Sequence, residues 1–216
     1  MSLKSSIKTV LTLGQGVTAG LPEATEGMDP IELFGTWFAA AGESGILLPE
    51  SVALATSTAA GTPSVRMVLL KGVDERGFVF YTNYASRKAD EMEANPQAAL
   101  CFHWAVLQRQ VRVNGAVERI SEEESANYFA TRERGSQLGA WASKQSQELE
   151  SREKLEARLE RLKGDHAVDV PLPPFWGGYR LAAREIEFWQ GRSDRLHDRL
   201  VFTRTDEGWS TRRLYP

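Results

Sequence analysis

A succession of short apolar runs separated by turn residues constrains the fold of this chain more than any other feature of its sequence. The runs with strand-like composition occupy residues 51–56, 65–70, 78–82, 98–104 and 108–120. Short strands joined by turns are typical of a β-sandwich or barrel. A doubly wound parallel sheet would need a regular helix between successive strands, and the sequence lacks this alternation. We therefore expect a mainly β fold.

Helices are expected at the periphery of this sheet. Pro30 suits the first turn of a helix whose apolar face carries Phe34 and Trp37. Further helical segments are expected at residues 86–94, 121–131, 136–142 and 146–163. Gly164 is a plausible stop for the last of them. A final antiparallel meander is expected to pass through Tyr179, Phe188, Val201 and Trp209.

Composition excludes several classes of function. Of the 216 residues, 42% are hydrophobic and 25% charged, and the net charge of −3 gives no basic field for nucleic acid or an anionic membrane. One cysteine, Cys101, and three separated histidines give no metal-ligand spacing. No apolar run reaches membrane-spanning length, and no signal peptide is evident, so we expect a cytoplasmic protein. Residues 1–29 are expected to form an N-terminal arm that can move, and residues 30–216 a single domain.

Two groups of side chains suggest binding of phosphates. Ser86 suits an N-cap, which places Arg87 and Lys88 in a first helical turn, where cations oppose the helix dipole but an anion binds well. Two side chains exposed to water would give the same pattern. Tyr128, Arg132 and Ser136 are spaced by four, so they share one face if helical geometry continues past Thr131; a frayed helix end is the alternative.

Further polar side chains are individually less specific. On the strand from residue 108 to residue 117, Val111, Val113 and Val117 share one face. Gln110 lies on the other face, where its amide could pair with the edge of a heterocycle. The polar turn Lys144-Gln145-Ser146 follows the expected helix at residues 136–142, and an N-cap role for Ser146 explains it equally well.

The segment Arg195-Leu196-His197-Asp198-Arg199 is the most suggestive one for chemistry. In a strand, Arg195, His197 and Arg199 would project from one face, and two guanidiniums beside an imidazole favour an anionic or electron-rich ligand. A solvated edge strand has the same pattern. The sequence shows no nucleophile beside a base and no glycine-rich phosphate loop. This inventory predicts a phosphorylated cofactor that performs the chemistry beside a second phosphorylated ligand.

Taken in order, these motifs resemble the pyridoxine 5′-phosphate oxidase family over residues 30–216. The motifs that carry the resemblance are Arg66-Met67-Val68-Leu69-Leu70-Lys71, Phe80-Tyr81-Thr82-Asn83, Ser86-Arg87-Lys88, Arg109-Gln110-Val111, Gly135-Ser136-Gln137-Leu138-Gly139-Ala140-Trp141-Ala142-Ser143, and Glu187-Phe188-Trp189-Gln190-Gly191 followed by residues 195–199. The resemblance implies an FMN-binding split β-barrel, a Greek-key-like antiparallel barrel. It also implies a homodimer with its flavins at the subunit interface.

The resemblance implies a role for each matching residue. FMN would be held by Arg66, Met67, Val68, Leu69, Tyr81, Thr82, Arg87, Lys88, Gln110, Gln145, Ser146, Trp189 and Arg199, partly from the second subunit. The substrate phosphate would be bound by Lys71, Tyr128, Arg132 and Ser136, with Arg195 and His197 as catalytic residues over the substrate ring. Arg66 and Lys71 have opposite parity on an ideal strand, so a bend or strand end must separate them.

The implied activity is oxidation of pyridoxine or pyridoxamine 5′-phosphate, with hydride transfer to flavin N5 and reoxidation by dioxygen that gives peroxide. Residues 1–29 depart from the family, because they contain neither the Arg nor the Tyr that its N-terminal arm usually carries. The related phenazine-biosynthesis flavin oxidases, which act on a tricyclic substrate without phosphate, are the alternative. The phosphate set with Lys71 and Arg132 argues against them. A protein that only binds flavin would not need Arg195 and His197.

Overall fold

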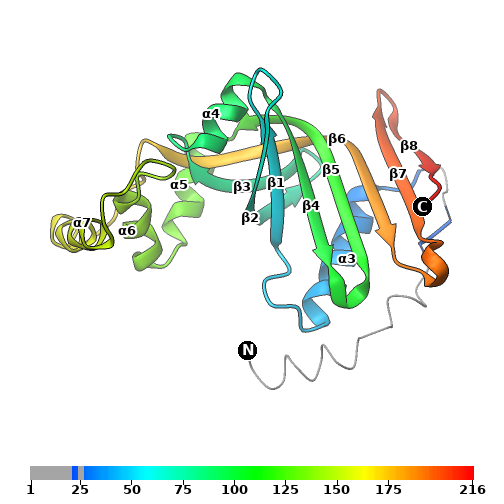
Figure 1. The fold of residues 1–216 in the computed structure, drawn as a ribbon, viewed down its shortest axis with the longest axis horizontal. Coiled ribbons are helices and arrows are strands. Elements are labelled where there is room, and N and C mark those ends of the chain that lie inside the picture. Colours follow the sequence, from blue (N-terminus) through cyan, green and yellow to red (C-terminus); the bar gives the residue numbers. More distant parts are fainter. Residues whose placement is uncertain (1–20, 24–26) are drawn as a thin grey trace.

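An antiparallel barrel lies at the centre of the structure, a computed structural model that describes residues 21–23 and 27–216 (Figure 1). The strands follow the order β3-β2-β1-β4-β5-β6-β7-β8, and an additional pairing of β3 with β6 closes the first six into a ring. Their bounds are β1 Ser51–Ser57, β2 Pro63–Asp74, β3 Gly77–Asn83, β4 Gln97–Trp104, β5 Arg109–Arg119, β6 Trp176–Gln190, β7 Asp198–Thr205 and β8 Gly208–Arg213. Strand β4 returns to pair with β1 outside the β1–β2–β3 meander, which is a Greek-key connection.

Alternation along the strands explains why these segments form a barrel. In β5, Val111, Val113 and Val117 are buried while Arg112 and Asn114 between them are exposed. Burying one face of each strand against a shared interior removes apolar area from water. The opposite face of β5 is polar, and the strands predicted from the sequence are confirmed.

Strand β6 gives the barrel its split form. Residues 176–181 of β6 pair with β3, whereas residues 185–190 pair with β7, and β5 pairs with both parts. The same strand therefore belongs first to the barrel and then to an extension of the sheet that carries β7 and β8. Figure 1 shows this long strand crossing the molecule from the helical end to the end that carries β7 and β8. The predicted split β-barrel is confirmed.

The described helices are α3 Pro30–Glu43, α4 Arg87–Ala94, α5 Glu122–Ala130, α6 Arg134–Ala142 and α7 Arg152–Asp165. Helices α6 and α7 pack against one another and lie to one side of the barrel (Figure 1). Helix α3 packs its apolar face into the core, where Phe34 lies 5.0 Å from Phe102 and Trp37 lies 5.2 Å from Phe188 between ring centroids. Two 3₁₀ turns, η1 Ala105–Leu107 and η2 Ser193–Arg195, complete the described elements. No helix within residues 21–23 and 27–216 is long and apolar enough to cross a membrane.

Helix α7 differs from the prediction at both ends. It begins at Arg152 rather than near Ser146, because Ser151 caps it by accepting a hydrogen bond from the Lys154 amide. Ser146 has a φ of 70°, which is incompatible with the extended backbone of an N-cap. Gly164 does not stop the helix, which continues through it to Asp165.

The expected N-terminal arm lies largely outside the described residues. Of its described part, Leu21 is buried and belongs to the core cluster. The carbonyl oxygen of Pro22 accepts a hydrogen bond from Arg213 at the C-terminal end of the chain, at 2.9 Å. This short segment is therefore held against the barrel and β8.

Candidate active site

A cavity of about 480 Å³ opens between the barrel and helices α5 and α6. The expected cofactor residues that line it are Met67, Val68, Leu69, Tyr81, Thr82, Lys88 and Gln145. The expected substrate-phosphate residues that line it are Lys71, Tyr128, Arg132 and Ser136. Because one cavity holds both sets, two ligands bound there can lie in contact.

Strand β2 has an irregularity at Lys71. The register between β2 and β3 shifts between Leu70 and Gly72. The irregularity expected between Arg66 and Lys71 is therefore present, but it does not bring the two cations to one face. Exposure alternates regularly through Met67, Leu69 and Lys71, and Arg66 does not line the cavity.

Arg132 is held by aromatic rings at one side of the cavity. Its guanidinium carbon lies 4.7 Å from the ring centroid of Trp176, and Tyr81 and Tyr128 stack with their centroids 3.9 Å apart beside it. Burial lowers the pKa of Arg132. Its Nη1 is buried and has no hydrogen-bond partner among the described residues. A buried N–H donor without an acceptor is costly, and an anionic ligand would satisfy it.

The helix expected to continue past Thr131 is interrupted. Tyr128, Arg132 and Ser136 therefore do not share one face of a single helix, as their spacing by four would require. Helix α5 ends at Ala130, and α6 begins at Arg134 after a turn in which the Arg132 amide donates to the Phe129 carbonyl. The turn, rather than a helical period, brings the three side chains to the cavity. The frayed helix end considered as an alternative is not what the structure has, since Arg132 is half-buried.

Lys88 is a buried cation on the opposite wall, in the first turn of α4. Its Nζ donates to Gln145 at 2.8 Å and to Thr82 and Ser86 at 3.1 Å each. Burial, and to a lesser extent the charge of Arg66, lowers its pKa to about 8. Ser86 precedes the helix as predicted, but its hydroxyl donates to the Asn83 carbonyl instead of capping α4. The hydroxyl therefore serves to hold Lys88 in place.

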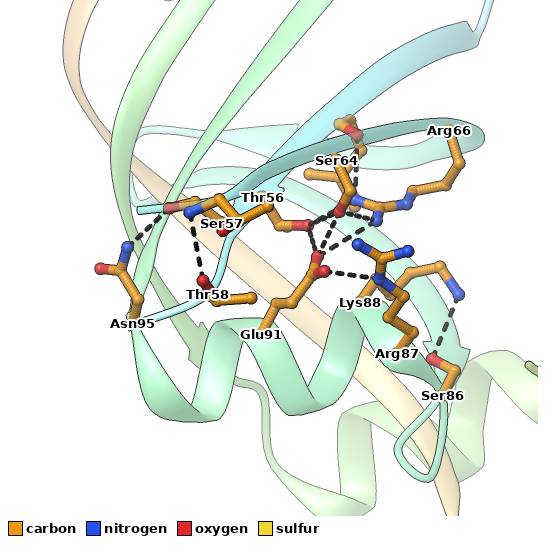
Figure 2. A network of polar contacts seen from close by, with 12 residues as sticks. Thr56, Ser57, Thr58, Ser64, Arg66, Ser86, Arg87, Lys88, Glu91 and Asn95 are labelled. Carbon is orange, nitrogen blue, oxygen red and sulfur yellow. Dashed lines mark hydrogen bonds and ion pairs between the residues drawn. The ribbon is translucent and has the colours of Figure 1, made fainter. Parts of the chain in front are cut away.

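Arg66 and Arg87 meet at a buried carboxylate beside Lys88, which Figure 2 shows. Glu91 accepts from Arg66 Nη2 at 3.2 Å and from Arg87 Nε at 2.8 Å. Burial alone would raise the pKa of Glu91, but hydrogen bonds, the largest from Ser64, lower it to about 2. With Lys88 included, the network keeps a surplus of positive charge beside the cavity.

A second group of expected site residues lies on the sheet extension, and we call Gln110, Trp189, His197 and Arg199 the C-terminal cluster. Gln110 is the cross-strand partner of Trp189, which in turn is the partner of Arg199. Arg199 donates through Nε and Nη2 to Glu187, a buried carboxylate that Arg112 also contacts. None of these four described side chains lines the cavity.

Arg195 and His197 do not share a strand face, so this part of the sequence interpretation is wrong. Arg195 lies in the 3₁₀ turn η2 with a φ of 61°, and β7 begins only at Asp198. Asp198 accepts from Arg192 Nε at 2.7 Å, and the Arg192 amide donates to His197 Nδ1 at 3.1 Å. These contacts fold the segment into a loop, where Arg195 is exposed. The His197 ring nevertheless lies 4.6 Å from Trp189, so it belongs with the C-terminal cluster.

Sequence reasoning missed several residues of the site. Asn83, Gly139, Ala140, Ser143 and Trp176 also line the cavity. Glu91 was missed although its spacing of four from Arg87 is a signal for an ion pair on a helix. Ser146 was expected beside Gln145, but it does not line the cavity in the described chain.

Known proteins are similar to this chain over its whole length. Residues 40–164 match the family described as Pyridoxamine 5′-phosphate oxidase, and residues 176–216 match the Pyridoxine 5′-phosphate oxidase C-terminal dimerisation region. A protein of Psychromonas ingrahamii named pyridoxine/pyridoxamine 5′-phosphate oxidase is 54% identical over 100% of both chains. One of the same name from Rubrobacter xylanophilus is 59% identical over 92% of each chain.

A solved structure resembles the whole fold. The crystal structure of PhzG from Burkholderia lata 383, in complex with tetrahydrophenazine-1-carboxylic acid, superposes with a TM-score of 0.88 at 34% sequence identity. The alignment covers 93% of this chain and 100% of that chain. The relatives with the higher identity are those named for pyridoxine and pyridoxamine 5′-phosphate.

Proposed function

Because the chain belongs to the pyridoxamine 5′-phosphate oxidase family, we propose that it is an FMN-dependent oxidase of pyridoxine and pyridoxamine 5′-phosphate. The observation that carries the proposal is the pair of separate cationic groups around one cavity. One group contains Arg132 with its unpartnered Nη1, and the other contains Lys88 beside Arg66 and Arg87. Two anion positions in one cavity suit a phosphorylated cofactor beside a phosphorylated substrate.

The charge of the second group fits the phosphate of FMN. Arg66, Arg87 and Lys88 bring three positive charges, and Glu91 compensates one of them. The remainder matches the nearly doubly negative phosphate monoester at neutral pH. Lys88 Nζ, whose three donors now bond Gln145, Thr82 and Ser86, would bind it by exchanging one of these acceptors for a phosphate oxygen. The backbone and side chains of residues 67–69 would lie along the ring system. The donors Thr82 and Gln145 line the same wall.

The first group would bind the substrate. Arg132 would give its free donor to the substrate phosphate, supported by Lys71, Tyr128 and Ser136 around the cavity. Bound FMN would supply the redox chemistry, with a hydride from the substrate as the reductant and dioxygen as the oxidant. The protein's part is to fix the distance and orientation of the substrate ring, which lowers the barrier by removing unproductive arrangements.

His197 would contribute a hydrogen bond to the reacting centre. Its Nδ1 accepts from the Arg192 amide, so the neutral imidazole carries its proton on Nε2. The Nε2–H is therefore the donor that His197 offers to a ligand. Arg195 would add a positive charge beside it from the exposed turn η2.

A homodimer would join the two parts of the site. The C-terminal cluster and the cavity lie at different ends of one chain, and β6 connects them across the molecule (Figure 1). The outer face of β2 leaves Val65 and Met67 69% and 61% exposed, which favours a partner surface. We infer that each complete site combines the cavity of one protomer with the C-terminal cluster of the other, and the match to a dimerisation region supports this.

One alternative rests on a specific observation, the similarity to PhzG with a bound tetrahydrophenazine carboxylic acid. Anaerobic flavin reduction separates the two. The holoenzyme is mixed without oxygen with pyridoxine 5′-phosphate or with a reduced phenazine carboxylate, and the loss of flavin absorbance is followed. We expect rapid bleaching by the phosphorylated substrate only. Bleaching by the phenazine alone would reject the proposed substrate, and bleaching by neither would reject both.

A further inference from the structure

We propose that Glu91 is a positioning residue, which sets the guanidiniums of Arg66 and Arg87 for the cofactor phosphate. The proposal rests on the proposed FMN site and names a residue that would set its affinity for the FMN phosphate. Glu91 is 4% exposed and lies on α4, whereas Arg66 comes from β2. A buried carboxylate requires partners, and here both charged partners are residues expected to bind phosphate.

The two oxygens of Glu91 divide the arginines between them. Oε2 accepts from Arg66 Nη2 at 3.2 Å, and Oε1 accepts from Arg87 Nε at 2.8 Å. Glu91 contacts each arginine through a single nitrogen, and Arg66 is also held through Nη1 by the Leu54 carbonyl oxygen at 3.2 Å. Arg87 remains 62% exposed, with donors left over for a ligand. The carboxylate brings together two cations that would otherwise repel one another.

Two hydroxyls complete the arrangement around Arg66 (Figure 2). Ser64 accepts from Arg66 Nη2 at 2.6 Å, and Thr56 accepts from Arg66 Nη1. Both hydroxyls donate onward to Oε2 of Glu91. A hydroxyl donates only one proton, so an acceptor at Glu91 fixes the direction in which each hydroxyl points. Loss of the Glu91 carboxylate would free both hydroxyls and remove the charged partner of Arg66, which would keep its contact with the Leu54 carbonyl oxygen.

A positioning role and a simple charge role predict opposite signs. If Glu91 acted only through its charge, its removal would make the site more positive and would tighten phosphate binding. If Glu91 positions the arginines, its removal lets them separate and weakens phosphate binding, because ordering them again costs entropy. A fall in FMN affinity on removal of Glu91 therefore indicates the positioning role, and a rise indicates a role through charge alone.

The test compares FMN with riboflavin, which lacks the phosphate. Full-length wild-type protein, Glu91→Ala and Glu91→Gln are titrated with each flavin, and binding is followed by quenching of flavin fluorescence. For Glu91→Ala we expect FMN affinity to fall at least about tenfold while riboflavin affinity stays within about twofold. For Glu91→Gln, which keeps one acceptor, we expect a smaller loss in the same direction. Unchanged or tighter FMN binding by either folded variant would overturn the proposal.

Asp90→Asn provides the matched control. Asp90 is exposed on the same helix, and its substitution removes the same charge without touching the network. We expect its FMN affinity to match wild type or to rise slightly. If Glu91→Ala does not fold, Glu91→Gln alone decides the sign. Wild-type protein that binds FMN no better than riboflavin would reject the proposed cofactor-phosphate site, a result distinct from failure of the Glu91 role.

Discussion

In the cavity, Arg132 has a buried Nη1 without a partner among the described residues, whereas Arg199 in the C-terminal cluster gives Nε and Nη2 to Glu187 and Nη1 to the Tyr215 carbonyl. The first guanidinium therefore has a donor to offer, and the second is already positioned by its own chain. The cavity is a concave site lined by the barrel and by helices α5 and α6. The C-terminal cluster is an open face, anchored in advance by Glu187.

This difference suggests different roles for the cavity and the C-terminal cluster in the proposed shared site. Each region contains a buried glutamate that holds two arginines, Glu91 with Arg66 and Arg87, and Glu187 with Arg112 and Arg199. Burial would raise the pKa of Glu187, but hydrogen bonds from Arg199 and Arg112 lower it. Both carboxylates thus stay charged and preorganise cations before a ligand arrives. Of these two regions, the cavity is the one in which a described side chain has a buried donor without a partner, so the substrate phosphate is expected there.

Replacing Arg132 with alanine should give the largest effect. The variant loses a charge-assisted hydrogen bond of about 1.5–3 kcal/mol. Steady-state kinetics should therefore show KM for pyridoxine 5′-phosphate raised about ten- to a hundredfold, with FMN content unchanged. Arg134→Ala, an exposed residue whose side chain contacts the loop after α7, is the control and should leave KM near wild type. A variant that loses flavin but keeps KM would assign Arg132 to the other phosphate.

His197→Asn tests the C-terminal cluster in the same way. The substitution keeps a hydrogen-bonding group but removes the Nε2–H donor from its present place. We expect kcat/KM to fall at least about tenfold, which corresponds to about 1.4 kcal/mol of transition-state stabilisation. Flavin content and Tm should stay close to wild type. His166→Asn, at the end of α7, is the control and should change neither. Unchanged turnover in His197→Asn would make this cluster structural.

A mixed dimer tests whether the two regions belong to different protomers. Arg132→Ala and His197→Asn chains are coexpressed with different affinity tags, and the heterodimer is purified through both tags. If each site joins the cavity of one protomer to the C-terminal cluster of the other, one of the two sites is free of substitutions, and activity recovers to about half of wild type. If each site lies within one protomer, both sites carry a substitution and activity stays at the level of the variants.

The strands, the barrel and the convergence of Lys71, Tyr128, Arg132 and Ser136 on one cavity could be predicted from the sequence. Alternation of buried and exposed residues is a local signal, so β5 with Val111 and Val113 was predicted correctly. The loop at Arg195 was not, because it depends on the contacts of Arg192 with His197 and Asp198, and alternation carries no information about such contacts.

The sequence predicted which side chains line the cavity better than it predicted the backbone elements that place them there. Tyr128 and Arg132 were expected on one helix, but a turn between α5 and α6 places them, since helix ends are set by backbone hydrogen bonds that spacing does not reveal. Glu91 was missed because a glutamate among charged residues on a short helix is usually solvated. Its burial depends on Ser64 and Thr56, cross-strand partners on β2 and β1 that lie 27 and 35 residues away in the sequence.

The smallest expected effect is a pH dependence of FMN binding at Lys88. Its pKa is about 8 because burial, and then Arg66, penalises the charged form, and phosphate binding favours that form. FMN affinity should therefore fall by about fourfold between pH 7 and pH 8.5, as Lys88 of the flavin-free protein loses its proton.

The free energy of unfolding of the flavin-free protein should rise over the same pH range. Because the pKa of Lys88 is lower in the folded state, the unfolded state binds more protons than the folded state above pH 8. The free energy of unfolding therefore rises with pH in that range. Lys88→Met should bind FMN weakly and independently of pH across this range. A wild-type affinity that stays constant to pH 8.5 would mean that Lys88 does not contact the phosphate.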